Sequence, residues 1–163
     1  MTPLVLETSQ WLPGSRESVF EFFADATNLN SITPTWLGFR ILTPLPVQMR
    51  AGARIDYRIR IRGWPVTWKT EITAWEPPLR FVDEQIRGPY RLWRHEHTFT
   101  PENDGTRMVD RVEYLVPLGS SFAGNLIHRW WVRPELERIF GFRRERLSNL
   151  FGSDTHKRNP STP

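Results

Sequence analysis

At 163 residues the chain is long enough for one domain with a sizeable core, and because it contains no cysteine, disulfides and thiolate metal sites are excluded. Its net charge of +4 is modest, and its apolar stretches all fall short of the ~20 residues of a membrane-spanning helix. Residues 1–10 lack the basic and apolar regions of a signal peptide, so we expect a cytoplasmic protein.

The chain begins with a strand that is followed by two short helices. Residues 4–11 alternate in the manner of a strand, and Pro13 ends it. Ser15 suits the N-cap of a first helix with a wide apolar side, and a second short helix is expected over residues 26–31.

Six further strands are expected, each separated from the next by a short connection with turn residues. They cover residues 39–43, 54–62, 64–75, 80–87, 90–100 and 106–116. Short connections join neighbouring strands as antiparallel pairs, so the sheet is predicted to be an antiparallel meander.

The arginines of the 54–62 strand bear on the question of a nucleic-acid partner, which a basic chain raises. These arginines alternate with Ile55, Tyr57, Ile59 and Ile61, as on the solvated face of a half-buried strand, and no run of five basic residues occurs. We therefore expect no nucleic-acid partner, and an arginine-rich docking protein is the weakest of the functional alternatives.

After residue 119 the pattern changes to that of a long amphipathic helix, with Ser120 or Ser121 as its cap. The stripe recurs at helical spacing through Leu136, Ile139, Phe140, Arg143, Leu147 and Leu150. Pro134 either kinks this helix or lies in the first turn of a new one. The chain is polar from Gly152, so we expect a domain over residues 1–151 and a disordered tail over 152–163.

The strand around residues 91–99 departs from a plain hydrophobic pattern. At a spacing of two, Trp93, His95, His97 and Phe99 share one face, whereas the opposite face is largely polar. Two histidines on an interior face need buried partners or a cavity. Because the chain also contains eight tryptophans, a lined binding pocket is favoured.

A long amphipathic helix that follows an antiparallel sheet can bury its stripe in the concave face of that sheet. We therefore predict an α+β fold in which six to seven antiparallel strands curve around a long C-terminal helix. Space left between helix and sheet is a candidate small-molecule pocket.

Strand phase gives the residues that are expected to face this pocket. The ligand-binding set is Tyr57, Ile59, Val66, Trp68, Phe81, Gln85, Trp93, Phe99, Val112, Tyr114 and Trp130, and the candidate catalytic set is His95, His97, Asp83 and Asp110. On the 80–87 strand, Phe81 favours an inward Asp83, whereas Val82 and Ile86 favour the reverse. Trp36 and Leu37 are candidates for a lid.

This order of elements resembles the START-like, helix-grip superfamily, also called SRPBCC, which includes polyketide cyclases and coenzyme-Q-binding domains. Similarity to a bacterial branch of it is carried by residues 72–78, 81–85, 88–90, 93–97 and 110–112. The resemblance implies a helix-grip fold over residues 4–150 and a hydrophobic ligand such as a lipid, quinone or polyketide. It implies no particular reaction, because members of the superfamily bind as well as catalyse.

Four interpretations of the polar cluster stay open. The first is a hydrogen-bond network that joins the strands, and the second is a site that orients the carbonyl or phenol head of a ligand. The third is a general acid–base pair, and the fourth is a metal site. For catalysis, His95 or His97 with Asp83 or Asp110 would supply a base for aldol or dehydration chemistry. A bare His-x-His motif is a weak signal for metal, so no metal or other cofactor is expected.

The expected function is therefore binding of a hydrophobic or aromatic small molecule between the sheet and the C-terminal helix. An enzyme of the cyclase or dehydratase type that uses the same cavity is the alternative. We expect a monomer or weak dimer without a transmembrane segment, and Trp130 with Trp131 leaves room for transient contact with a membrane.

Overall fold

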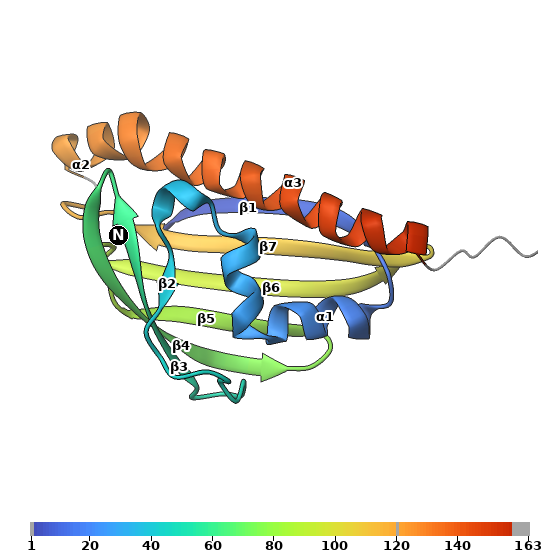
Figure 1. Cartoon of the computed structure of the whole chain (residues 1–163). Coiled ribbons are helices and arrows are strands. Elements are labelled where there is room, and N and C mark those ends of the chain that lie inside the picture. Colours follow the sequence, from blue (N-terminus) through green and yellow to red (C-terminus); the bar gives the residue numbers. More distant parts are fainter. Residues whose placement is uncertain (1, 120, 158–163) are drawn as a thin grey trace, which may run out of the picture.

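The computed structural model describes residues 2–119 and 121–157 of the chain (Figure 1). The N-terminal elements are β1 (Leu4–Pro13), α1 (Arg16–Ala24) and two short 3-10 helices, η1 (Ala26–Ile32) and η2 (Thr35–Leu37). The remaining strands are β2 (Arg40–Ile41), β3 (Arg54–Ile61), β4 (Trp64–Glu76), β5 (Arg80–Arg87), β6 (Leu92–Glu102) and β7 (Gly105–Leu115). The chain then forms α2 (Phe122–Ile127), the π-helical η3 (His128–Val132) and α3 (Arg133–Lys157).

All seven strands belong to one antiparallel sheet in the order β1-β7-β6-β5-β4-β3-β2. The meander from β3 to β7 follows the short connections of the sequence, whereas the longer segment 42–53 joins β2 to β3. The strand β1 pairs with β7 and forms the other edge of the sheet. The long helix α3 runs along the same side of the curved sheet as α1 (Figure 1). The predicted α+β helix-grip fold is confirmed.

The first helix begins as its sequence predicts. Ser15 is the N-cap of α1, and its Oγ accepts a hydrogen bond of 3.2 Å from the backbone N–H of Ser18. From this start α1 directs Val19, Phe20 and Phe23 into the interior, where all three are buried.

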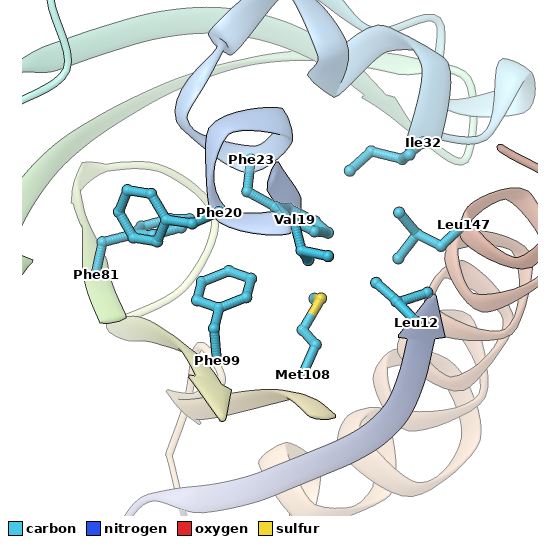
Figure 2. Packing of buried hydrophobic residues seen from close by; sticks show 9 residues of the cluster. All are labelled: Leu12, Val19, Phe20, Phe23, Ile32, Phe81, Phe99, Met108 and Leu147. Atoms are coloured by element: carbon cyan, nitrogen blue, oxygen red, sulfur yellow. The ribbon is translucent and has the colours of Figure 1, made fainter. Parts of the chain in front are cut away.

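Two hydrophobic clusters hold the helices on the sheet. In the first, side chains from α1, from the sheet and from Leu147 of α3 meet in a common interior, as Figure 2 shows; its members are Leu12, Val19, Phe20, Phe23, Ile32, Phe81, Phe99, Met108 and Leu147. In the second, Val112, Tyr114 and Val116 of the sheet end pack against Leu136 and Phe140 of α3. Together they fix α3 at two places along its length.

The structure resolves the two alternatives for Pro134. It is the second residue of α3, directly after the π-helical turn η3. Because proline has no N–H, a wider turn before it accommodates the missing hydrogen bond without a break in the helix. At the other end α3 continues to Lys157, past the boundary expected at Gly152, whereas the rest of the expected tail, residues 158–163, lies outside the described residues.

Within the described part of the chain, no helix combines the length and the apolar character needed to cross a bilayer.

Candidate functional site

Three adjacent strands bring the four residues of the predicted polar cluster together. Asp83 of β5 is paired with His95 of β6, and His97 of β6 is paired with Asp110 of β7. The ring of Phe81 stacks on that of His97 with centroids 4.2 Å apart, so Phe81 and Asp83 form the inward face of β5. This selects one of the two faces that the sequence leaves open.

Asp110 contacts one nitrogen of each imidazole. Its Oδ1 lies 3.2 Å from His95 Nε2, within hydrogen-bond distance, and 2.6 Å from His97 Nδ1. The second pair is close enough for an ion pair but is not aligned as a hydrogen bond. The Asp110 side chain is only 5% exposed, so its charge depends on these partners.

Asp83 contacts the other nitrogen of each ring. Its Oδ2 lies 3.2 Å from His97 Nε2 and 3.7 Å from His95 Nδ1. The two imidazole rings are themselves close, with centroids 3.9 Å apart. Each histidine is therefore held between two carboxylates, one from each neighbouring strand.

Arg143 of α3 completes the cluster from the helix side. Its Nε lies 3.6 Å from Asp110 Oδ2, and its guanidinium lies over the ring of Phe23 at 5.4 Å from the centroid. Helical periodicity places Arg143 on the apolar stripe but assigns it no role. The available signal was its charge, because a cation on the buried face of a helix requires a partner.

The surroundings move the pKa values of the cluster in different directions. Burial alone would raise the pKa of Asp110, but Arg143 and the two histidines outweigh burial and hold this pKa well below its ordinary value. Burial, and then the neighbouring His97, lower the pKa of His95. Burial acts in the same direction on His97, yet its contacts with Asp110 and Asp83 outweigh burial, and the pKa of His97 is raised. Two adjacent histidines whose pKa values are moved apart in this way suit proton transfer.

A cavity of about 410 Å³ lies against this cluster, between the strands β3 to β6 and α3. Asp83, His95, His97 and Arg143 are part of its wall, which is otherwise mostly apolar and aromatic, whereas Asp110 lies behind the histidines. A mostly apolar cavity of this size with a few convergent polar groups is typical of a small-molecule site.

Five residues of the predicted ligand-binding set line the cavity: Tyr57, Ile59, Trp68, Phe81 and Trp93. Three of the aromatic rings form a continuous wall. Tyr57 and Trp68 stack with centroids 5.9 Å apart, and Trp68 meets Trp93 edge-on at 5.2 Å.

The other six members of that set, Val66, Gln85, Phe99, Val112, Tyr114 and Trp130, do not line the cavity. Phe99 is packed in the cluster around α1, and Val112 and Tyr114 are packed against α3. The Gln85 side chain bonds the backbone of Tyr90 through both its nitrogen and its oxygen, which closes the turn after β5. Val66 lies near the hairpin end of β4, half-buried but outside the cavity.

Trp131 takes the place that was expected for Trp130. Trp130 is 64% exposed, whereas Trp131 is both half-exposed and part of the wall, so it lies where the cavity meets solvent. The Arg62 guanidinium lies 4.4 Å from the centroid of the Trp131 ring. Of the two lid candidates, Leu37 lines the cavity, and Trp36 is anchored to α3 because its Nε1 donates a hydrogen bond of 3.1 Å to Glu135.

Comparison with known proteins agrees with this geometry. The family model for "Polyketide cyclase / dehydrase and lipid transport" matches residues 12–130. No curated protein matches the chain.

Solved structures share its fold at low identity. Protein Ms6760 from Mycobacterium smegmatis is 16% identical, with 93% of this chain and 92% of that chain covered and a TM-score of 0.67. The protein TTHA0849 from Thermus thermophilus is 18% identical over 90% of this chain and 99% of its own, with a TM-score of 0.63. The major latex-like protein 151 from Panax ginseng is 9% identical over 93% of this chain and 99% of its own, with a TM-score of 0.60. At these identities the likeness is one of fold.

Proposed function

Because the chain belongs to the family of polyketide cyclases, dehydrases and lipid-transport proteins, we propose that it binds a hydrophobic small molecule, of lipid, quinone or polyketide type, in the cavity beside His95 and His97. The observation that carries the proposal is the cavity of about 410 Å³ with its mostly apolar wall. Family membership supports a hydrophobic ligand without naming it.

The distribution of polar groups on the wall supports an orientation for that ligand. The stacked rings of Tyr57 and Trp68 provide flat apolar surface for an aromatic or hydrocarbon body. Asp83 and His97 provide hydrogen-bonding groups for a carbonyl or phenol at one end. Few polar groups on an apolar wall typically fix the orientation of a ligand.

Native mass spectrometry of gently purified protein tests this function, followed by denaturing extraction of any bound molecule. We expect a stoichiometric hydrophobic ligand in the wild type and lower occupancy in Ile59→Phe, because the longer aromatic side chain projects into the cavity and narrows it. Ile86→Phe is the matched control, since Ile86 is 51% exposed on β5 and does not line the cavity. Equal occupancy of the two variants would contradict binding in this cavity.

An enzyme of the cyclase or dehydratase type is the second candidate. The observation that favours it is the presence of His97 and Asp83 on the cavity wall, 3.2 Å apart, where both can reach a bound molecule. Incubating the extracted ligand, or a poly-β-ketone, with wild-type protein and with His97→Gln would test this role. Loss of one water or ring closure with the wild type alone, at unchanged affinity for the variant, would establish catalysis. Unchanged compounds with both proteins would leave binding as the function.

A further inference from the structure

His95 and His97 make four contacts with Asp83 and Asp110, which is more than their N–H groups can satisfy by hydrogen bonds. Asp110 Oδ1 lies 3.2 Å from His95 Nε2 and 2.6 Å from His97 Nδ1, and Asp83 Oδ2 lies 3.2 Å from His97 Nε2 and 3.7 Å from His95 Nδ1. A carboxylate accepts hydrogen bonds but does not donate them, so each contact needs a proton or a cation between its atoms. Two neutral imidazoles bring two N–H groups to four contacts, and replacing one of them by an imidazolium brings only a third.

The two N–H groups of the neutral rings are assigned to hydrogen bonds with Asp110. Asp110 is 5% exposed, against 17% for Asp83, and it makes the shortest of the four contacts. An imidazole lone pair that faced this buried carboxylate at 2.6 Å would be strongly repelled. A small rotation of the His97 ring aligns its Nδ1–H with Asp110. Both histidines then present their remaining lone pairs to Asp83 Oδ2.

We propose that His95 Nδ1, His97 Nε2 and Asp83 Oδ2 are the protein ligands of a divalent first-row transition metal ion such as Zn²⁺ or Fe²⁺. Two imidazole nitrogens and one carboxylate oxygen are the donor set that such ions take when they keep open positions. Ca²⁺ and Mg²⁺ do not fit, because they prefer oxygen ligands throughout.

The distances between the three donor atoms suit one ion. Ligand atoms about 2.1 Å from a metal lie about 3.0 Å apart at octahedral angles and about 3.4 Å apart at tetrahedral angles. The carboxylate oxygen of Asp83 lies 3.2 Å from one histidine donor and 3.7 Å from the other, and all three donors lie within 4.8 Å of one another. A contraction of a few tenths of an ångström brings His95 Nδ1 and Asp83 Oδ2 to the tetrahedral separation, and binding of the ion would also draw the two histidine donors together from within 4.8 Å.

Asp110 and Arg143 supply the support that histidine ligands require. A histidine that binds metal typically donates its other N–H to a carboxylate, which fixes the ring and its tautomer. Asp110 Oδ1 is hydrogen-bonded to His95 Nε2 and, once the His97 ring has rotated, accepts from His97 Nδ1 as well, while Arg143 Nε lies 3.6 Å from its other oxygen. Asp110 is thus a positioning residue for the site and not a ligand.

The open coordination positions face the cavity, because Asp83, His95 and His97 all belong to its wall. The apolar chamber and the metal therefore meet, and an oxygen of the cavity ligand or a water molecule can complete the coordination. The metal site goes beyond the proposed small-molecule function and is tested without any organic ligand.

Titration of tag-free, full-length protein with metal alone provides the test, after treatment with EDTA and desalting. We expect one Zn²⁺ per chain by calorimetry, and Co²⁺ absorption bands that indicate nitrogen ligands. Asp83→Asn should weaken Zn²⁺ binding by at least about 100-fold, and Asp110→Asn by about 10–100-fold. The control is the double variant His128→Gln/His156→Gln, which alters the other two histidines of the chain and should bind as the wild type does.

Absence of stoichiometric binding of Zn²⁺, Co²⁺ and Fe²⁺ to the wild type would overturn the proposal. So would an affinity that Asp83→Asn leaves unchanged, since the ion would then lie elsewhere. Circular dichroism establishes that each variant is folded, and His95→Gln replaces Asp83→Asn if the latter is not. A second readout is the thermal midpoint, which Zn²⁺ should raise in the wild type and leave unchanged in a ligand variant.

Discussion

The buried contact between Arg143 and Asp110 predicts a large loss of stability when the guanidinium is removed. Arg143→Met keeps most of the apolar length of the side chain and deletes its charge. In the wild type Arg143 Nε lies 3.6 Å from Asp110 Oδ2, and the side chains are 14% and 5% exposed. Removing one partner of a buried pair costs about 3–5 kcal/mol, because the other charge stays buried without compensation. The two histidines still contact Asp110, so we expect the lower end, about 3 kcal/mol.

A double-mutant cycle separates this charge effect from lost packing. Asp110→Asn in the Arg143→Met background removes the uncompensated carboxylate, so the double variant should recover at least about 1 kcal/mol relative to the sum of the single losses. Arg138→Met serves as control on the same helix, since Arg138 is 60% exposed, and should change stability by less than about 0.5 kcal/mol.

Urea unfolding followed by tryptophan fluorescence, with EDTA present, measures all four variants. A loss below about 1 kcal/mol for Arg143→Met would refute the view that this arginine neutralises a buried carboxylate. Strictly additive single and double variants would refute the coupling between the two side chains.

Three further outcomes follow from other parts of the molecule. Gly105→Ala should lower the free energy of unfolding by about 1–3 kcal/mol, because an added Cβ would lie 2.5 Å from a backbone oxygen of β1. Gly141→Ala in α3 should raise it by up to about 1 kcal/mol, because an added Cβ there has nothing within 4 Å. The thermal midpoints of the two variants should therefore shift in opposite directions. Burial alone would raise the pKa of Glu96, but hydrogen bonds from Arg80 and a second arginine outweigh it and lower the pKa, so Glu96→Gln should cost less than about 1 kcal/mol at neutral pH. The stability difference between wild type and Glu96→Gln should be present above the ordinary carboxyl pKa and vanish as the pH falls through the lowered pKa of folded Glu96. Urea midpoints measured across this pH range test it, and a difference between the two proteins that does not change with pH would contradict the reasoning. Trp131→Ala should release the probe 1-anilinonaphthalene-8-sulfonate several-fold faster in stopped-flow fluorescence, and unchanged release would indicate another exit.

The fold and the polar cluster could be predicted from local periodicity. The alternation along β6 places His95 and His97 on one inward face, and short turns make β5 and β7 its antiparallel neighbours. Once neighbours and phase are known, Asp83 and Asp110 have to lie beside the histidines. Phase alone could not choose the inward face of β5, because Phe81 and the adjacent Val82 are both buried, on opposite faces.

The extent of the cavity could not be predicted, because strand phase says which face a residue takes but not what lies opposite it. Phe99 and Val112 are inward as expected, yet α1 or α3 packs directly against them and leaves no space. Ile59 and Trp68 lie on the same face where no helix closes the gap. The role of Arg143 is likewise a matter of how α3 docks on the sheet, which no spacing within the helix encodes.

The position of Trp131 depends on the π-helical turn before Pro134. In a regular α-helix each residue advances by about 100°, so Ile127, twelve positions before Ile139, would point about 120° away from it. The π turn η3 takes up one extra residue and removes about 100° of that rotation, which leaves the two side chains within about 20°. Both indeed line the cavity, together with Trp131. Pro134 therefore shapes the cavity entrance, because the turn that accommodates it rotates α2 and the tryptophan pair relative to the apolar stripe of α3.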